Sequence, residues 1–270
     1  MAQGKVEICG VNTAKLPLLK QAQKDALIDL NLHLKKGDFV TVIGGNGAGK
    51  STMLNAVAGV FGVEKGHIKI GGVDVTKDPE FKRAKYIGRV FQDPLRGTAG
   101  DMWIEENLAM ALRRGKRRSF RWGISNKERE MYVELLKTLD LGLETRLNSK
   151  VGLLSGGQRQ ALTLLMATMK NPQLLLLDEH TAALDPKTAK KVLDITNKVG
   201  TENNLTTLMI THNMNDAIKY GNRLIMMNNG QIIYDVSGEE KQNLKVSDLL
   251  AKFEQHSDGE FANDRMMLAN

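Results

Sequence analysis

The pattern of hydrophobic and polar positions along the chain shifts repeatedly between two periods. Residues 26–34 alternate apolar and polar side chains, which predicts a strand with one buried face. Residues 174–177 are consecutive leucines, a run typical of a strand buried on both faces. Residues 126–141 instead carry apolar side chains at helical spacing, with Met131, Leu135 and Leu139 on one face.

The remaining segments continue this alternation of strands and helices. Further strands are predicted at 5–11, 40–43, 67–70, 86–91, 206–210, 224–227 and 231–234, and further helices at 53–58, 101–112, 158–170, 186–199, 214–220 and 246–253. Residues 12–25 are polar and are expected to form a loop, and Asn228-Asn229-Gly230 is a hairpin signal. Because strands and helices alternate, we expect an α/β fold whose mainly parallel sheet is covered on both faces, with a helical insertion from about 96 to 162.

Composition places only broad limits on the class of protein. The 270 residues are 41% hydrophobic and 26% charged, as in a soluble globular protein, and we find neither a long apolar run nor a secretory signal. The single cysteine, Cys9, excludes an intrachain disulfide, fits a reducing cytosol and is interpreted as a small apolar residue in a strand. A net charge of +7 is compatible with a polyanionic partner, an anionic membrane surface or simply a basic soluble protein.

The clearest chemical signal is the loop that follows the strand at 40–43. Gly44 to Ser51 match the pattern G-x-x-x-x-G-K-[ST]. Glycines let successive N–H groups point inward around phosphate oxygens, and the following helix adds its positive dipole end. Lys50 supplies a charge for the β- and γ-phosphates, and the Ser51 hydroxyl can ligate Mg²⁺. The alternative is a glycine-rich turn without a ligand, but the flanking strand and helix favour nucleotide binding by Gly44, Gly45, Asn46, Gly47, Ala48, Gly49, Lys50, Ser51 and Thr52.

Two adjacent carboxylates, Asp178 and Glu179, follow the leucine strand. Ligands of parallel sheets bind at the carboxyl ends of the strands, which is also the edge of the phosphate loop. Asp178 would then face the magnesium, and Glu179 would polarise an attacking water. The alternative is a strand that ends in ordinary surface acids.

A third segment, Ser155-Gly156-Gly157-Gln158, precedes a helix and places a hydroxyl and glycine N–H groups at its N-terminus, as a second anion site would require. Taken alone, it also fits a serine cap followed by a flexible turn. In this context the chain resembles the ATP-binding subunits of ABC transporters over residues 5 to 236. The matching segments, in the order and spacing of that family, are Gly44 to Ser51 (Walker A), Gln92 (Q-loop), Ser155 to Gln158 (signature motif), Leu174 to Glu179 (Walker B), Ala183 to Asp185 (D-loop) and His212 (switch histidine).

The resemblance implies a fold and a mechanism. The fold would be a P-loop NTPase (RecA-like) core with an antiparallel β subdomain at 1–95 and 163–236, a helical signature subdomain at 96–162 and a C-terminal extension at 237–270. Two copies would bind ATP head to tail, so that Ser155, Gly156, Gly157 and Gln158 of one copy close the site of the other. Mg²⁺ would be held by Ser51, Gln92 and Asp178. Catalysis would involve Glu179, His212 and Gln92, and Asp185 would lie at the dimer seam.

Three features depart from the family pattern. No aromatic residue precedes Phe39, so an aliphatic contact from Leu16 or Leu18 would replace stacking on adenine. His180 stands where many members have proline, as a tolerated substitution or with a role in catalysis. The loop at 12–25 is longer than the family predicts.

A basic stretch, Arg113 to Arg121, has six cationic residues in nine, with Phe120 and Trp122 beside them. It fits a solvated loop, and it also fits a surface that faces anionic headgroups or cytoplasmic loops of a membrane partner.

Taken together, the resemblance predicts an ATPase subunit of an ABC transporter, cytoplasmic and peripheral on the inner membrane. It would act as a homodimer beneath separate permease subunits, with a solute-binding protein in the complex. Residues 96–103 look like those of amino-acid importers. The alternative from another class is a soluble ABC-type ATPase acting on nucleic acid or ribosomes, which the charge would suit, but such chains usually carry two tandem sets of motifs. We therefore expect no nucleic acid partner. A third option, a nucleotide-binding module without hydrolysis, is disfavoured by the intact Glu179 and His212.

Overall fold

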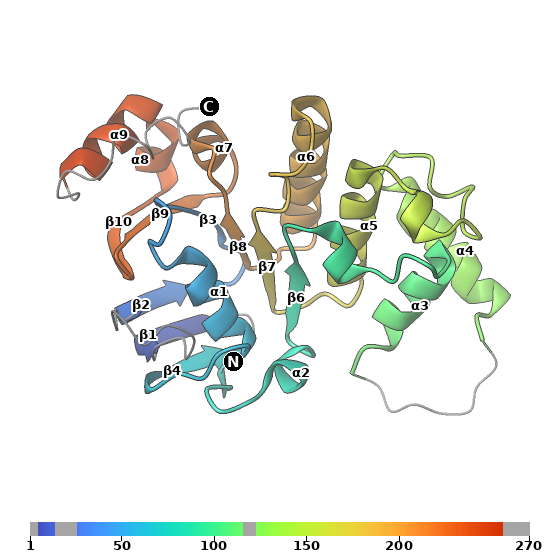
Figure 1. Ribbon diagram of the computed structural model, residues 1–270, viewed down its shortest axis with the longest axis horizontal. Helices are drawn as coiled ribbons and strands as arrows, with labels where there is room; N and C mark the ends of the chain where they lie inside the picture. The colour runs from blue at the N-terminus through green and yellow to red at the C-terminus, as the bar shows by residue number, and fades with distance from the viewer. Residues whose placement is uncertain (1–4, 14–25, 116–122, 256–270) are drawn as a thin grey trace.

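The computed structural model describes residues 5–13, 26–115 and 123–255, and in that part of the chain the strands form two sheets. The larger sheet has the strand order β10-β9-β3-β8-β7-β6, and the smaller has the order β2-β1-β4-β5. The strands are β1 (Val6–Thr13), β2 (Leu27–Leu34), β3 (Phe39–Ile43), β4 (Lys65–Ile70), β5 (Val73–Asp74), β6 (Ile87–Val90), β7 (Leu174–Asp178), β8 (Thr207–Ile210), β9 (Arg223–Asn228) and β10 (Gln231–Ser237). Figure 1 shows the two sheets on one side of the molecule and a group of helices on the other.

The larger sheet is parallel from β9 through β3, β8 and β7 to β6, and only β10 runs antiparallel. Leucines of β7 alternate between its two faces. Leu174 and Leu176 join the hydrophobic core that contains α1 (Lys50–Ala58) and the smaller sheet. Leu175 and Leu177 join the core on the opposite face. The predicted α/β fold, with a sheet covered on both sides, is confirmed.

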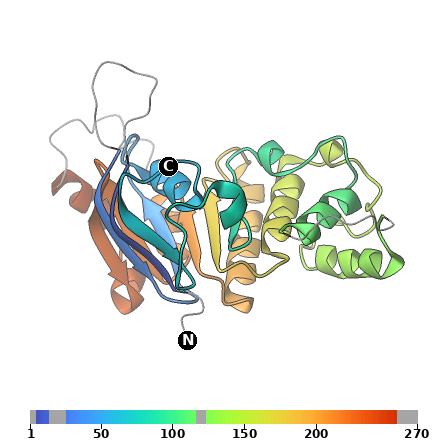
Figure 2. The same ribbon diagram turned by 90° about the horizontal axis from the view of Figure 1, so that it is seen from below.

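The opposite face of the sheet is covered by α5 (Gly156–Thr168) and α6 (Pro186–Glu202), which pack against each other. Beyond α5 lie α3 (Ile104–Arg113) and α4 (Asn126–Lys137), which form the far end of the molecule in Figures 1 and 2. These helices share one continuous core with the sheet. The boundary expected at residue 162 falls within α5.

After β8 the chain completes the larger sheet with β9 and β10 and forms helices before and after this hairpin. Helix α7 (Met214–Lys219) precedes the β9–β10 hairpin, whose turn residues Asn229 and Gly230 have φ values of 46° and 78°, as the hairpin signal requires. Two helices follow, α8 (Gly238–Gln242) and α9 (Val246–Gln255), and α9 packs Leu249 and Phe253 against α7.

Several elements differ from the expectation in length. The helix expected from residue 101 starts at Ile104, because the Asn107 side chain holds the preceding turn through bonds to the Ala99 N–H (2.8 Å) and the Trp103 carbonyl (2.9 Å). The strand β5 and the short helices α2 (Glu80–Arg83) and α8 were not expected, since elements this short carry no periodic signal.

Candidate functional site

The phosphate loop connects β3 to α1, as the sequence predicts. The Lys50 side chain is buried, and its Nζ donates hydrogen bonds to the carbonyls of Gly44 (2.6 Å) and Gly45 (3.0 Å). Gly49 caps α1 with φ at 97°, and a Cβ there would lie 2.8 Å from the Ala26 carbonyl oxygen. The loop therefore needs glycine at this position for both backbone angle and space.

The other predicted site residues are brought to the loop by strand order. Because β3, β8 and β7 are neighbours and run parallel, their carboxyl ends meet at one edge of the sheet. Asp178 ends β7, and its Oδ1 lies 3.5 Å from the Ser51 Oγ, at the long limit for a hydrogen bond. His212 follows β8, and its Nε2 lies 2.6 Å from the Glu179 Oε1.

The two adjacent carboxyl groups are in different electrostatic environments. Burial raises the pKa of Asp178, and the nearby Arg89 guanidinium opposes that rise. The hydrogen bond from His212 lowers the pKa of Glu179, against the effect of partial burial. Glu179 is thus held as a carboxylate that accepts a hydrogen bond, which is the state a general base needs.

Arg89, on β6, is a residue of this edge that the sequence reasoning missed. Its Nη2 lies 3.7 Å from the Asp178 Oδ2 and donates to the Asn55 Oδ1 at 2.6 Å. Its guanidinium also lies over the Phe91 ring, 4.6 Å from the centroid. The available signal was a charged residue in the middle of an otherwise apolar buried strand.

Gln92 is exposed and directly follows β6 and Phe91, at the same edge of the sheet. The carbonyl of Phe91 accepts a hydrogen bond from Gln160 Nε2 at 3.1 Å, and Gln160 is fully buried on α5. Gln92 therefore lies where the sheet meets the helices, as expected.

Ser155 caps the N-terminus of α5 in a capping box. Its Oγ accepts from the Gln158 N–H at 3.3 Å, and its own N–H donates to the Gln158 Oε1 at 3.2 Å. Ser155 and Gly156 are exposed. In Figure 1 helices α5 and α1 lie on opposite sides of β6 and β7, so this segment does not face the phosphate loop of its own chain.

Asp185 is exposed and caps α6, where its Oδ1 accepts from the Thr188 N–H at 3.1 Å. Hydrogen bonding from the side chain of Thr188, and then from its backbone, lowers the pKa of Asp185. The starts of α5 and α6 are in close contact, because a Cβ on Gly157 would lie 2.0 Å from the Thr188 Cγ2. The signature segment and Asp185 thus lie close together at the N-terminal ends of α5 and α6.

The expected adenine contact at Leu16 or Leu18 and most of the basic stretch fall on residues 14–25 and 116–122, which lie outside the described residues. The two described arginines of the basic stretch have internal partners. Arg113 Nη2 bonds to Glu128 Oε1 at 3.0 Å, and Arg114 Nη2 approaches the Ala167 carbonyl at 3.4 Å. Cys9 lies on β1 as a free, partly buried thiol, in keeping with its interpretation as a strand residue.

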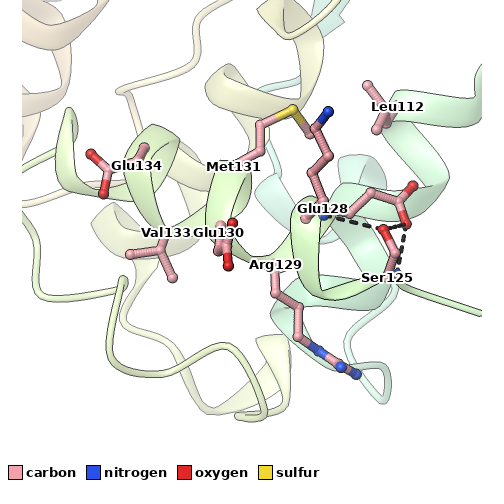
Figure 3. Close-up of a pocket in the computed structure, with 9 residues that line it drawn as sticks. Leu112, Ser125, Glu128, Arg129, Glu130, Met131, Val133 and Glu134 are labelled. Carbon is pink, nitrogen blue, oxygen red and sulfur yellow. Dashed lines mark hydrogen bonds between the residues drawn. The ribbon is translucent and has the colours of Figure 1, made fainter.

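A pocket of about 700 Å³ lies along the outer side of α4, where Figure 3 shows its lining residues. It is lined by Leu112, Ser125, Lys127, Glu128, Arg129, Glu130, Met131, Val133 and Glu134. None of the predicted site residues lines it. Within the described ranges no helix is long and apolar enough to span a bilayer. In the same ranges no three His, Cys, Asp or Glu side chains group as a metal site.

A phosphate loop after β3 and paired carboxylates at the end of β7, at one edge of a mainly parallel sheet, define a P-loop ATPase. The ABC transporter family model matches residues 27–182, so the chain belongs to the ABC transporter family and is an ATP-binding ATPase subunit. A tyrosine transport ATP-binding protein of Clostridioides difficile (strain R20291) is 45% identical over 226 residues, covering 84% of this chain and 90% of that protein. A methionine import ATP-binding protein of Lactobacillus delbrueckii subsp. bulgaricus is 34% identical over 223 residues, covering 79% of this chain and 60% of that protein.

Solved structures of ATP-binding cassettes share this fold. A dimeric cassette in a post-hydrolysis state with ADP and Pi is 29% identical, with a TM-score of 0.71, covering 86% of this chain and 98% of that chain. The ADP conformation of another ABC transporter cassette is 25% identical, with a TM-score of 0.75, covering 92% and 98%. The predicted P-loop NTPase fold and ATPase class are confirmed.

Proposed function

We propose that this chain is the motor subunit of an ABC importer for amino acids, with aromatic ones such as tyrosine as the first candidates. The substrate class rests on the similarity to a tyrosine transport ATP-binding protein, which spans most of both chains. The observation that carries the motor function is the meeting of the phosphate loop, Asp178, Glu179 and His212 at one sheet edge.

The ATP site is proposed to be shared between two copies in a head-to-tail homodimer. One copy binds the phosphates through Gly44–Thr52, and Ser155–Gln158 of the other closes over them. The exposure of Ser155 and Gly156, with α5 and α1 on opposite sides of the strands, supports closure in trans. Asp185, exposed beside the signature segment, would lie at the seam.

The residues at the sheet edge also fit a magnesium ion. Mg²⁺ prefers oxygen ligands and usually binds through one or two carboxylates or hydroxyls together with substrate phosphates. Ser51 and Asp178 offer a hydroxyl and a carboxylate within 3.5 Å of each other, and Gln92 could add an amide oxygen from the next strand end. When bound, the ion would neutralise phosphate charge.

In hydrolysis, Glu179 would orient a water and accept its proton as the water oxygen bonds to the γ-phosphorus. The bond from that phosphorus to the β–γ bridging oxygen breaks, and the products are ADP and phosphate. His212 already donates to Glu179 at 2.6 Å, so with nucleotide bound it would turn to the γ-phosphate and release the carboxylate for the water. Lys50 would leave its two loop carbonyls for the β- and γ-phosphates in the same way.

We further propose that the dimer sits on the cytoplasmic face of the membrane beneath separate permease subunits, with a solute-binding protein delivering the cargo. Relatives named as import ATP-binding proteins support this arrangement. No nucleic acid is expected to take part.

The dimer is tested with Glu179→Gln, which keeps the side chain's shape and removes its basicity. With saturating ATP and Mg²⁺, this variant should elute from a size-exclusion column as a dimer, whereas Lys50→Ala/Glu179→Gln should remain a monomer because it cannot hold the phosphates. A monomeric Glu179→Gln protein that still binds ATP would contradict the shared site.

The cargo is tested by deleting the gene and measuring uptake of labelled tyrosine, phenylalanine and lysine. Aromatic uptake should fall and be restored by the native chain but not by Glu179→Gln. Unchanged uptake of all aromatic amino acids would overturn the proposed substrate class while leaving the ATPase function intact.

A further inference from the structure

The backbone leaves β7 through an unusual turn at Glu179. Its φ is 48°, a left-handed conformation that costs a non-glycine residue about 1 kcal/mol or more. Such a conformation persists only where neighbouring contacts hold it. On one side it is held by β8, because the Glu179 N–H donates to the Ile210 carbonyl at 3.2 Å.

The other side is held by the next residue, His180. This residue is 2% exposed, and its Nε2 lies 3.0 Å from the Thr196 Oγ1 on α6. The side chain of Glu179 reaches His212 in the site, and that of His180 is buried against α6. The two adjacent residues of this turn therefore contact different parts of the fold. Glu179 contacts His212, which follows β8, and His180 contacts α6.

The direction of the His180 bond follows from the single proton of the threonine hydroxyl. Thr196 Oγ1 donates that proton to the Val192 carbonyl at 2.8 Å, so it can only accept from His180. His180 must therefore carry its proton on Nε2. Burial lowers the pKa of His180 to about 4, so the ring is neutral near pH 7 and has this one N–H to give.

We propose that His180 is a positioning residue for hydrolysis, which fixes the turn that carries Glu179 by donating a hydrogen bond to Thr196 of α6. The proposal rests on the proposed role of Glu179 as the base. Without the bond, the strained turn has one fewer anchor, and the Glu179 carboxylate spreads over more positions relative to the water it must orient.

Helix α6 is a suitable anchor because it begins at Asp185 and abuts the start of α5 through Thr188. The side of α6 that receives His180 is fully packed, since Thr196 is 1% exposed. The bond therefore connects the turn of Glu179 to the helix whose first residues border the signature segment.

The experiment compares steady-state ATPase kinetics of the full chain with Thr196→Val, Thr196→Ser, His180→Phe, and the pair His180→Phe/Thr196→Val. Valine matches the shape of threonine without accepting a bond, serine keeps the hydroxyl, and phenylalanine keeps a ring without the N–H. Affinity for a fluorescent ADP analogue reports whether each variant is folded, and Glu179→Gln is measured alongside as a test of the base itself.

Thr196→Val and His180→Phe should each lower kcat about three- to tenfold, the usual value of one hydrogen bond, with KM and ADP affinity within about twofold of wild type. The pair should lose no more than either alone, and Thr196→Ser should keep wild-type kcat. A wild-type kcat in all four variants would overturn the proposal. So would a loss of kcat in the double variant that equals the product of the losses in the two single variants. An active Glu179→Gln would instead show that the proposed base is wrong.

Discussion

His180 makes the stability of this protein depend on pH in the mildly acidic range. Burial lowers its pKa from 6.5 to about 4 in the folded chain. Between these values the unfolded chain binds a proton that the folded chain does not, so falling pH favours unfolding. The effect is absent above about pH 7 and reaches about 2 kcal/mol at about pH 5, since each unit of pKa difference corresponds to about 1.4 kcal/mol.

Urea denaturation of the wild type and His180→Phe at about pH 7 and about pH 5 measures this loss. The wild type should lose about 2 kcal/mol more than the variant on acidification, because phenylalanine has no proton to bind. His33→Gln serves as the control for replacing a histidine, since the His33 side chain is exposed on β2. An identical loss in wild type and His180→Phe would refute the assignment of this dependence to the buried imidazole.

Three further predictions concern other parts of the chain. Lys241 is buried on α8, and its Nζ donates to the carbonyls of Ile218 (2.9 Å), Tyr220 (2.6 Å) and Gly221 (2.9 Å) at the end of α7. Calorimetry should therefore show that Lys241→Met lowers Tm by about 10 °C, whereas replacement of the exposed Lys245 with methionine does not. Gly49→Ala should abolish binding of a fluorescent ATP analogue, because its Cβ would meet the Ala26 carbonyl; Gly47→Ala, with positive φ but open space around the Cβ, should keep part of the affinity. Replacing His212 with alanine should raise the pKa of Glu179, since the hydrogen bond that lowers it is lost, and carboxyl carbon NMR titration would detect the change.

The fold was predictable where periodicity and length agree. The alternating residues of β2 and the leucines of β7 occupy strands, and the Asn229-Gly230 turn closes the last hairpin as expected. Helix ends were less predictable, because they depend on side chains that bond to the backbone. The Asn107 side chain, for example, bonds to backbone groups of residues that precede α3. Elements of a few residues, such as α2 and α8, were missed for lack of a repeat.

The candidate site was predictable as motifs and not as an arrangement. The order of the strands brings Asp178 near Ser51 and brings His212 into contact with Glu179. Strand order depends on pairing between segments that are distant in the sequence, and no local pattern encodes it. Buried cations were missed for a related reason. Arg83 donates to the Ala56 and Val57 carbonyls at the end of α1, and sequence alone would place this arginine in solvent. His180 looked like a tolerated substitution because its partner, Thr196, is sixteen residues away on a helix.

Each ATP site is proposed to be completed by the signature segment of a second chain. The most direct measurement is disulfide formation between Asn46→Cys and Ser155→Cys in a chain that also carries Cys9→Ser and Glu179→Gln. With ATP present, oxidation should give a covalent dimer on a non-reducing gel, and neither cysteine alone should do so. A cross-link confined to single chains, or none in a protein shown to bind ATP, would contradict the shared site.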